Sequence, residues 1–560
     1  MKIHGYRVAC TLGLCLAVPC AGCGSDGDGS PANTPTDAGV ESSPDAPDAP
    51  DDVAADQTED TSPEAAPDGD TPDGDVPDVP DAPEGPVVVT VYSTSDEHGW
   101  LQPWVSNGRV YGGIANVFAS MKTNGFDPGM DLIVSSGDNW TGAAVTTVFE
   151  GKPMVEAFNY MGYAATAIGN HEFDFGVPGL VERISESDYA YVAANLRDKG
   201  TPNQVSFAAP YVIVQRQGID VGLIGITTPA TATATNPKNV ADIDFAPIVE
   251  TLDAVIPEVR AAGAEMVLVL AHHDAYYMKL IASQLTARPD AIFTGHDHAH
   301  NHEVVAGIPL VGSGVNLGGY AVTRLQYDPA AAQTTFLDSE FSSVSYPESL
   351  TNPLTPDPGL ASLVDGWQQQ LDVLLGEQIG YSVTGIPQGW AMGNWVTDSW
   401  LWAFPDADVA MTNFGGLRVP VPAGAVKLQH VFDVMPFSNV IYELELTGEQ
   451  LRHDVAVATG QCAFGSGCSL AIAGIRYTGT SSNVSVVLSD GTPIDPTATY
   501  RVLVNDYMYE AGPYPLKTQD PTPVDLGVNY RDPVADWTKQ LGTTPSDPIE
   551  AHIDTAPRGQ

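Results

Sequence analysis

The sequence predicts an α/β fold followed by a smaller α+β domain, on three observations. Apolar runs of strand length recur from Val87 onward and alternate with segments whose apolar residues repeat about every 3.6 positions, as in amphipathic helices. Several of these runs are apolar throughout, which is typical of strands covered on both faces. After about residue 380 the pattern changes to β-rich segments with few helices. Buried strands that alternate with helices indicate an α/β sheet.

The first 23 residues are expected to be an export signal. Positively charged residues precede an apolar run at 8–18 that is too short to span a bilayer. The run ends at Ala21-Gly22-Cys23, which resembles the lipobox of bacterial lipoproteins, although Cys20 stands where that motif usually has Leu. Cys23 is therefore the expected lipidation site. The alternative is an ordinary secretory signal with a chance cysteine.

Residues 24–86 form a strongly acidic segment with about nineteen Asp and Glu, about a dozen Pro and no Lys or Arg. Such a segment lacks the apolar content to offset chain entropy, so we expect a disordered, extended tether. The net charge of the chain is −47, which argues against binding of nucleic acid because that binding relies on basic residues. No second apolar stretch reaches membrane-spanning length, so membrane contact is expected only through an N-terminal lipid anchor.

The first folded domain is expected to span residues 87–345. Its apolar runs of strand length lie at 87–94, 131–135, 164–168, 190–194, 221–226, 266–271, 290–294 and 308–311. Between several of them lie helix-like segments, at 112–122, 152–161, 246–261 and 277–287. In such folds ligands collect at the loops beyond the strand ends.

A linker and connecting helix are expected at residues 346–380, and a second domain at 381–553. The linker is rich in Pro and Thr, and its amphipathic pattern predicts a helix at Leu360–Glu377, ending at Gly380. The β-rich segments of the second domain extend to about residue 512, after which the chain is polar, Pro-rich and weakly patterned.

Cys462 and Cys468 are the only cysteines after the first 23 residues. They lie six positions apart in a Gly-rich stretch that can bring the two sulfurs together. We expect a structural disulfide that closes this loop, which agrees with an oxidising compartment.

Five polar clusters follow apolar runs in chain order and supply metal-binding residue types. They contribute two carboxylates, one amide and four imidazoles: Asp96, His98, Asp138, Asn170, His272, His296 and His298. Such a set can hold two divalent cations side by side, with one carboxylate shared between them. The alternative is five unrelated surface loops that carry His and Asp by chance.

In this order the motifs Asp-x-His, Gly-Asp, Gly-Asn-His-Glu, His-His and Gly-His-x-His resemble the calcineurin-like metallophosphoesterases. Within that superfamily, Asn-His-Glu-Phe-Asp and the second domain resemble the 5′-nucleotidase family. The resemblance extends from about residue 87 to about residue 512. It implies a four-layer metallophosphoesterase sandwich, in which two mixed sheets are flanked by helices, and a smaller α+β C-terminal domain that binds substrate.

The resemblance also implies a ligand set for each metal. One metal is assigned to Asp96, His98, Asp138 and His298, and the second to Asp138, Asn170, His272 and His296. Asp138 is then the bridge, which suits a carboxylate because each oxygen can face one cation. Imidazole and carboxylate ligands suit two divalent ions of Zn, Mn, Fe or Co. His273 is the alternative to His272 as a ligand.

The reaction implied by the resemblance is hydrolysis of a phosphate ester by a hydroxide that bridges the two metals. The residue that corresponds to His171 is not a ligand in the family. The resemblance pairs His171 with Asp174 and gives the pair a role in stabilising the transition state and donating a proton. The alternative for Asp174 is a turn residue or a helix N-cap.

Three segments of the second domain resemble the family's substrate contacts. Asn413, Gly415, Gly416 and Arg418 resemble the Asn-x-Gly-Gly-x-Arg segment, in which the Asn and the Arg contact substrate. Phe437 lies in a Pro-Phe-x-Asn motif and Tyr507 at the position of a second aromatic residue, and the two are implied to clamp a base by stacking. The alternative for both aromatic residues is ordinary core packing.

Two segments depart from the family pattern. Residues 388–394 contain no Arg, whereas family members carry one or more Arg there that grip the terminal phosphate. Residues 511–514 replace the family's Gly-Gly-Asp-Gly, whose Asp contacts the ribose. Losing both groups is expected to weaken nucleotide recognition. Trp390, Trp395, Trp400 and Trp402 either reshape the substrate pocket or pack in the core.

The sequence therefore predicts an exported metal-dependent phosphoric ester hydrolase, lipid-anchored at the bacterial cell envelope, on the outer membrane or the cell surface. Its expected partners are small-molecule phosphate esters such as nucleotides, and no oligomeric state is predicted. One alternative keeps the scaffold but makes the protein a cyclic-nucleotide phosphodiesterase, a nucleotide-sugar hydrolase or a thiosulfohydrolase. The other alternative is a catalytically silent surface binding protein.

Overall fold

The computed structural model describes residue 83 and residues 85–106, 108–461 and 469–559, all of which belong to one compact unit. The expected signal at 1–23 with Cys23, almost all of the expected tether at 24–86, and the Cys462–Cys468 pair lie outside the described residues. None of the described helices combines the length and the apolar character that crossing a membrane requires.

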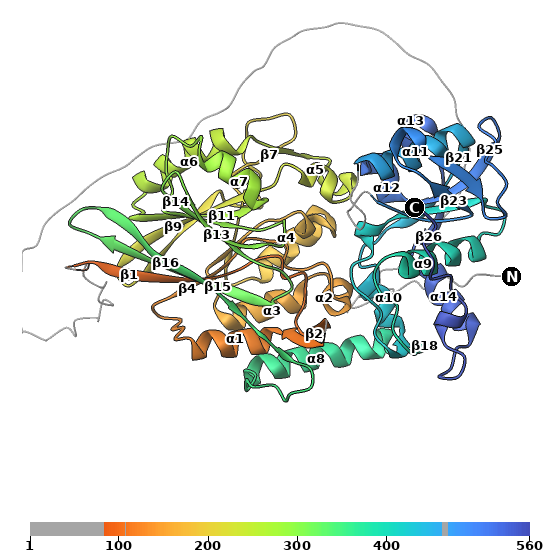
Figure 1. Ribbon diagram of the computed structural model, residues 1–560. Coiled ribbons are helices and arrows are strands. Elements are labelled where there is room, and N and C mark those ends of the chain that lie inside the picture. The colour runs from red at the N-terminus through yellow and green to blue at the C-terminus, as the bar shows by residue number, and fades with distance from the viewer. Residues whose placement is uncertain (1–82, 84, 107, 462–468, 560) are drawn as a thin grey trace, which may run out of the picture. The chain divides into compact units, whose positions relative to one another are not determined.

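Two six-stranded mixed sheets form the centre of the first domain (Figure 1). The first sheet has the order β16-β15-β1-β4-β5-β6 and comprises β1 (Val87–Thr94), β4 (Leu132–Ser135), β5 (Ala165–Ala167), β6 (Ala190–Val192), β15 (Gly319–Asp328) and β16 (Gln333–Ser343). The second has the order β13-β14-β12-β11-β9-β8 and comprises β8 (Tyr211–Arg216), β9 (Ile219–Thr227), β11 (Met266–His272), β12 (Ala291–Thr294), β13 (His300–Val305) and β14 (Ile308–Ser313).

Each sheet contains four parallel strands: in the first sheet they reach one edge and the antiparallel strands lie at the other, whereas in the second sheet one antiparallel strand lies at each edge. Strands β1, β4, β5 and β6 are parallel to one another, and so are β9, β11, β12 and β14. These are the strands at all eight apolar runs named from the sequence. The antiparallel strands β8, β13, β15 and β16 were not among them.

Helices cover the outer face of each sheet. Against the first sheet pack α1 (Ile114–Thr123), α3 (Lys152–Met161), α4 (Gly176–Glu186) and α8 (Pro358–Leu375). Against the second pack α6 (Ile248–Ala261) and α7 (Ala275–Ala282). A third apolar cluster lies between the sheets and joins Val91 and Val134 of one to Leu223 and Leu268 of the other. In Figure 1 the layers run from α6 and α7, through both sheets, to α1, α3 and α8, which confirms the four-layer sandwich.

Several helix boundaries differ from the sequence prediction by a few residues, and two of the differences have clear local reasons. The connecting helix α8 begins at Pro358, because the Asp357 carboxylate accepts the main-chain N–H groups of Gly359 and Leu360. Helix α7 ends at Ala282, short of the predicted residue 287. The N–H groups of residues 286 and 287 donate instead to Asp253 on α6, which replaces helical hydrogen bonds.

Smaller elements complete the first domain. A three-stranded sheet has the order β17-β3-β2 and comprises β2 (Pro103–Ser106), β3 (Arg109–Gly112) and β17 (Ser345–Pro347). The short elements between the large strands are α2 (Ala144–Val148), the 3-10 turn η1 (His171–Phe173), β7 (Leu196–Asp198), α5 (Thr231–Ala234), the 3-10 turn η2 (Pro237–Val240) and β10 (Ile243–Phe245).

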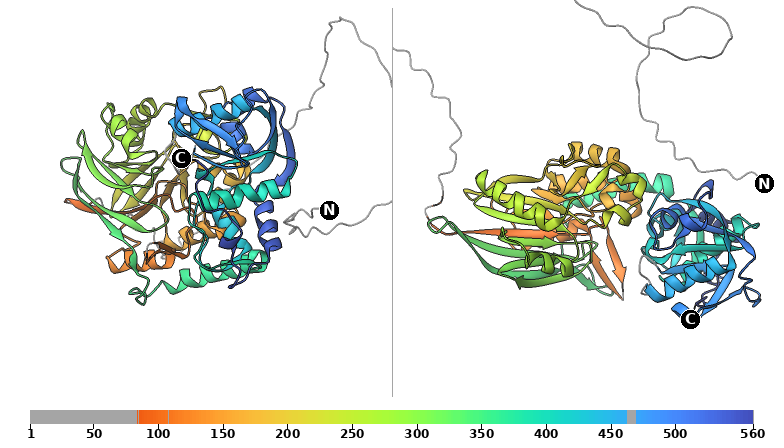
Figure 2. Two further views of the ribbon diagram at one scale, coloured as in Figure 1. Left: turned by 45° about the vertical axis from the view of Figure 1, so that its right-hand side comes forward. Right: turned by 90° about the horizontal axis from the view of Figure 1, so that it is seen from above.

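The second domain is built on a five-stranded sheet, shown in cyan to blue in Figures 1 and 2. Its order is β22-β19-β25-β21-β26, with β19 (Val409–Asn413), β21 (Val440–Thr447), β22 (Leu470–Ala473), β25 (Thr499–Asn505) and β26 (Val524–Asn529). Two strand pairs lie outside it: β18 (Gln378–Ser382) with β20 (Gly424–Lys427), and β23 (Ile475–Thr478) with β24 (Ser485–Leu488). The helices are α9 (Trp390–Ala403), α10 (Leu428–Val434), α11 (Gly448–Gln461), α12 (Asp506–Ala511), α13 (Leu516–Gln519) and α14 (Asp532–Leu541).

Regular structure in the second domain continues past residue 512, where the sequence pattern becomes weak. Strand β26 lies at the edge of the sheet and is largely exposed, so it carries little apolar signal. Helix α14 packs its Val534 beside Trp395 and Trp400 of α9 in one apolar core. Those two tryptophans are fully buried, which makes them core residues and not parts of a substrate pocket.

A hydrogen bond joins the two domains at α2 and α10. The Asp433 carboxylate of α10 accepts the main-chain N–H of Ala144, the first residue of α2, at 2.7 Å. Burial raises the pKa of Asp433 from 3.8 to about 7. The folded state therefore favours the protonated carboxyl. The stability that the protonated Asp433 carboxyl contributes is fully present below about pH 4 and is lost as the pH rises through 7.

We expect Asp433→Asn to lose less stability than the wild type when the pH rises from 4 to 8. The difference in free energy of unfolding between the variant and the wild type should shift in favour of the variant by roughly 2–4 kcal/mol over this range. The amide oxygen can still accept the N–H of Ala144, and it carries no charge that burial would penalise. Urea unfolding of both proteins at pH 4, 6 and 8 measures the effect. An equal pH dependence in the two proteins would show that Asp433 keeps its ordinary pKa when folded.

Candidate metal centre and active site

The seven predicted metal ligands lie where the parallel strands end. Strand β1 leads to Asp96 and His98, β4 to Asp138, β5 to Asn170, and β12 to His296 and His298, while β11 ends at His272. The carboxyl ends of parallel strands lie at one edge of a sheet, which is why residues from such distant parts of the chain can meet.

Three overlapping groups of ligand-type atoms form at this edge, and the atoms of each group lie within 4.8 Å of one another. The groups are Asp96, His98 and His298; His98, Asp138 and His171; and Asp138, His272 and His296. Asp138 belongs to two of the three groups, which is the position that a bridging carboxylate requires. Asn170 joins the cluster through its Oδ1, which lies 3.1 Å from Nε2 of His272.

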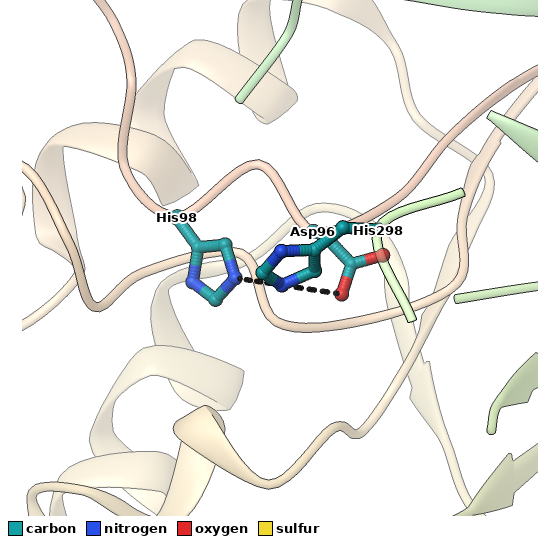
Figure 3. Close-up of side chains that lie close together, drawn as sticks. All are labelled: Asp96, His98 and His298. Atoms are coloured by element: carbon teal, nitrogen blue, oxygen red, sulfur yellow. Dashed lines mark hydrogen bonds and ion pairs between the residues drawn. The ribbon is translucent and has the colours of Figure 1, made fainter. Parts of the chain in front are cut away.

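The shortest contacts in the cluster join atoms that would repel one another without a cation or a proton between them. Figure 3 shows Nε2 of His98 facing Nε2 of His298 at 3.1 Å, with Oδ1 of Asp96 at 3.8 Å from the latter. On the other side, Nε2 of His272 lies 3.0 Å from Oδ2 of Asp138. Lone pairs that converge in this way are typical of a metal site.

The imidazole protons of His98 and His272 lie on the nitrogens that face away from the site. Nδ1 of His98 is 2.8 Å from the carbonyl oxygen of Thr141, and Nδ1 of His272 is 2.9 Å from that of Ser136. Because a carbonyl can only accept, each Nδ1 carries a proton, and Nε2 is the nitrogen that each imidazole turns toward the cluster. Metal-ligating histidines are commonly oriented in this way.

The two histidines of the Gly-His-x-His motif are held neutral. Burial lowers the pKa of His296 to about 4 and that of His298 to about 3. Metal binding requires a neutral imidazole, so neither residue has to lose a proton near neutral pH.

The backbone of the site is strained. Five of the seven predicted ligands have positive φ: Asp96 at 50°, His98 at 46°, Asp138 at 59°, His296 at 76° and His298 at 60°. Non-glycine residues rarely adopt this conformation, and such residues gather at functional sites. The convergence, the lone pairs and the strain together make this donor set fit divalent cations, although the role of each residue as a ligand stays a prediction.

His273, the alternative ligand, lies away from the cluster. Its Nδ1 is 3.0 Å from Oγ1 of Thr228, and its ring stacks on Tyr277 at 5.4 Å. Of the two neighbouring histidines, His272 is therefore the one that faces the site.

His171 and Asp174 form a hydrogen-bonded pair beside the metal ligands. Nδ1 of His171 lies 2.7 Å from Oδ2 of Asp174. Burial lowers the pKa of His171, but the carboxylates of Asp174 and Asp138 outweigh it, so the net shift is upward. Asp174 is not a helix N-cap, because Phe175 precedes the first residue of α4.

Glu172 is a buried residue that the sequence analysis did not single out, although it is part of Gly-Asn-His-Glu. Its carboxylate accepts the main-chain N–H groups of Gly169 at 2.6 Å, Asp138 at 2.9 Å and Asn139 at 2.7 Å. Glu172 thereby fixes the loop that carries Asp138 against the loop that carries Asn170. Its role is to position ligands.

The predicted substrate residues of the second domain share one cavity with several of the predicted metal ligands. The cavity has a volume of about 720 Å³. The residues of both domains that line it include His98, Asp138, Asn170, His171, Asp174, Asn413, Gly415, Gly416, Arg418, Phe437 and Tyr507. The sequence pattern alone could not show that the two groups of residues face each other.

Arg418 brings a positive charge close to the predicted metal ligands. Its Nη2 lies 3.5 Å from Nε2 of His98, and burial lowers the pKa of the guanidinium from its ordinary value. Within the described part of the chain, no ion pair involves Arg418 (N···O distance up to 4.0 Å). A half-buried guanidinium without a carboxylate within ion-pair distance is suited to bind an anion.

Phe437 and Tyr507 line the cavity and contact the first domain. The Phe437 ring stacks on His171, with ring centres 5.5 Å apart and an interplanar angle of 17°. The Tyr507 hydroxyl donates to the carbonyl oxygen of Thr233 at 3.0 Å. Both residues are thus placed at the site, and their role as a clamp for a base stays a prediction.

The two departures from the family pattern have structural counterparts. Gln388 lines the cavity in the segment that lacks Arg, and its Nε2 donates to the carbonyl oxygens of Leu417 and Arg418 at 3.0 and 2.6 Å. Gln388 thereby holds the loop that carries Arg418. Tyr514, in the segment that replaces Gly-Gly-Asp-Gly, is buried in the core of the second domain.

Comparison with known proteins agrees with this arrangement. Residues 382–514 match the family model of the 5′-nucleotidase C-terminal domain. The 5′-nucleotidase of Vibrio cholerae is 25% identical over 503 residues, which cover 77% of this chain and 87% of that protein. Endonuclease YhcR of Bacillus subtilis is 25% identical over 467 residues, which cover 76% of this chain but only 37% of that protein.

A solved structure shares the fold of both domains. The 5′-nucleotidase precursor from Thermus thermophilus superposes with a TM-score of 0.72 at 22% identity, covering 85% of this chain and 99% of that one. At this identity the likeness shows the fold alone.

Proposed function

We propose, since this chain belongs to the 5′-nucleotidase family, that it is an extracytoplasmic two-metal phosphoesterase that hydrolyses nucleotides or related phosphate esters. One observation carries the proposal. Ligand-type side chains from four loops and the end of strand β11 converge around Asp138, beside a cavity that the half-buried guanidinium of Arg418 also lines.

The cavity residues would divide between two divalent cations. Asp96, His98, Asp138 and His298 would hold one, and Asp138, Asn170, His272 and His296 the other. When bound, such a pair would activate a water for attack and neutralise charge on the phosphoryl oxygens. Zn, Mn, Fe and Co all suit imidazole and carboxylate ligands.

The chain's own residues would bind the phosphate and move a proton. Arg418 would donate hydrogen bonds to the phosphoryl oxygens, where charge builds up in the transition state. His171, protonated through its contact with Asp174, would donate a proton to the leaving oxygen. Asn413, Gly415, Gly416, Phe437 and Tyr507 would bind the remainder of the substrate from the second domain.

The proposed location rests on the first 86 residues. The export signal, Cys23 as the lipidated residue and the acidic tether together favour a protein held by lipid at the cell envelope, with its body in the periplasm or outside the cell.

A second candidate keeps the metals and changes the substrate. It is favoured by Gln388 in place of an arginine and by Tyr514 in the core in place of a ribose contact. A cyclic nucleotide, a nucleotide sugar or a thiosulfate ester would then replace the nucleoside monophosphate.

A metal analysis combined with a product screen tests the proposed function. We expect the purified chain, loaded with Mn or Zn, to hold two metal ions and to release phosphate from nucleotides or aryl phosphates. Preference for a diester or a nucleotide sugar would select the second candidate. Two bound metals without turnover of any substrate would instead indicate a binding protein.

A further inference from the structure

A short segment of the first domain lies between the catalytic pair and the second domain. This bridging segment, residues 231–240, contains α5 and η2 and lines the cavity with Thr235, Asn236 and Asn239. The sequence analysis assigned it no role. Its hydrogen bonds run in two directions, toward Asp174 on one side and toward α12 on the other.

On the first side the bridging segment holds Asp174 by two bonds. The Thr235 hydroxyl donates to Oδ1 of Asp174 at 2.9 Å, and Nδ2 of Asn239 donates to the Asp174 carbonyl oxygen at 3.0 Å. The other carboxylate oxygen of Asp174 faces Nδ1 of His171. Each oxygen of the carboxylate therefore has its own donor, so rotation of the carboxylate about its axis is blocked.

Thr235 is well placed to hold that orientation. It is only 2% exposed, so water offers little replacement for its hydroxyl. Asp174 fixes the orientation of the His171 imidazole. The hydroxyl of Thr235 therefore controls where Nε2 of His171 points, through two hydrogen bonds in series.

On the second side the bridging segment receives the second domain. Nδ2 of Asn236 donates to Oδ2 of Asp506 at 3.0 Å, and the Tyr507 hydroxyl donates to the carbonyl oxygen of Thr233. The other oxygen of Asp506 accepts the main-chain N–H of Val440 at 3.1 Å, which anchors this carboxylate within the second domain. Lys238 adds a bond to the hydroxyl of Tyr442 at 3.0 Å.

We propose that Thr235 is a positioning residue for the His171–Asp174 pair, and that the bridging segment makes this positioning depend on contact with the second domain through Asp506. The inference rests on the proposed function, because it presumes that His171 takes part in turnover. On this proposal, contact with the second domain sets the rate of reaction as well as substrate binding.

The first test compares Thr235→Val with Thr235→Ser in the full chain. Valine keeps the shape and removes the donor, so kcat is expected to fall about tenfold while KM changes less than about twofold. Serine keeps the hydroxyl and is expected to restore most of kcat. Thr251→Val is the matched control, because Thr251 is also buried and its hydroxyl donates to the carbonyl oxygen of Pro247, directly before its own helix α6.

The second test asks whether the effect reaches Thr235 from the second domain. Asp506→Asn is expected to lower kcat by a few-fold in the wild type but to have less effect in Thr235→Val, since both changes act on one path. Equal kcat in the wild type and Thr235→Val, or equal loss in the valine and serine variants, would overturn the inference. If Asp506→Asn lowers kcat by the same factor in the wild type and in Thr235→Val, the positioning by Thr235 does not depend on the second domain.

A third readout separates failure of this inference from failure of the proposed function. The Nδ1 proton of His171 can be followed by NMR in the protein as purified and assigned by its loss in His171→Asn. We expect its resonance to shift or broaden in Thr235→Val and to stay unchanged in Thr235→Ser. An unchanged resonance in the valine variant would refute the positioning role whether or not the wild type turns over substrate.

Discussion

Replacing Asp138 with Asn is expected to lower phosphate release by about 10³-fold or more and to reduce the metal content below two ions per chain. The carboxylate is 2% exposed and belongs to two of the three ligand groups. Its Oδ2 lies 3.0 Å from Nε2 of His272. An amide has no negative charge and offers only one acceptor, so it cannot join two cations.

Asparagine is the informative replacement because it leaves the local backbone intact. Asp138 has φ of 59°, a conformation that Asn tolerates better than Ala does. The amide oxygen can still accept the main-chain N–H of His171, which now donates to Oδ1 at 2.8 Å. A loss of activity would then report the missing charge.

Elemental analysis and phosphate release, measured on the same preparations, check this prediction. His302→Gln is the control, because His302 lies on β13 beside Phe336 and outside the cluster. It should keep both the metals and the activity. Two metal ions per chain in Asp138→Asn would contradict the bridging role of Asp138. Wild-type activity in this variant would show that the predicted metal ligands take no part in the reaction.

Uninterrupted apolar runs marked the parallel strands of the first domain, whereas β15 was missed although most of its residues are buried, because polar residues interrupt its sequence. The strands at the eight apolar runs are the parallel ones, and β11 is buried at every position. Strand β16 alternates between exposed and half-buried residues over its length, and β13 is mostly exposed. An exposed antiparallel strand carries polar residues on its open face, so a search for apolar runs passes over it.

The candidate site divides in a similar way. Asp96, Asp138 and His272 could be found because each stands in a short motif directly after a strand. Thr235 stands in no motif, and its only signal is a hydrogen bond to a residue 61 positions away. The loop-fixing role of Glu172 likewise depends on main-chain groups of one other loop, at Asp138 and Asn139, which sequence spacing does not bring close to it.

In the second domain, too, the sequence identified residues but not their contacts. The Asn-x-Gly-Gly-x-Arg motif identified Arg418, but not that its guanidinium reaches within 3.5 Å of a first-domain histidine. The Pro-Phe-x-Asn motif likewise identified Phe437, but not that the Phe437 ring lies against His171 of the first domain. A motif specifies a residue type, whereas the contacts it makes depend on how the two domains pack.

Replacing His171 with Asn is expected to lower kcat by about 10²–10⁴-fold while both metals stay bound. Asparagine cannot donate a proton to the leaving oxygen, but its main-chain N–H can still bind Asp138. The carboxylates of Asp174 and Asp138 raise the pKa of His171 above 6.5 in spite of its burial. In the wild type, kcat should therefore fall as the pH rises through this raised pKa, and that alkaline limb should be absent in the variant.

The metal content of His171→Asn decides between two roles for the residue. His171 forms a ligand-type group with His98 and Asp138, and its Nε2 lies 4.0 Å from Oδ2 of Asp138. If it were a ligand, the variant would lose a metal together with its activity, and Asp174→Asn would weaken metal binding as well. If it is a proton donor, both variants should keep two metals, and Asp174→Asn should move the alkaline limb to lower pH because the raising carboxylate is gone. Rate and metal content measured across pH separate these outcomes, since a lost ligand lowers both and a lost donor lowers only the rate.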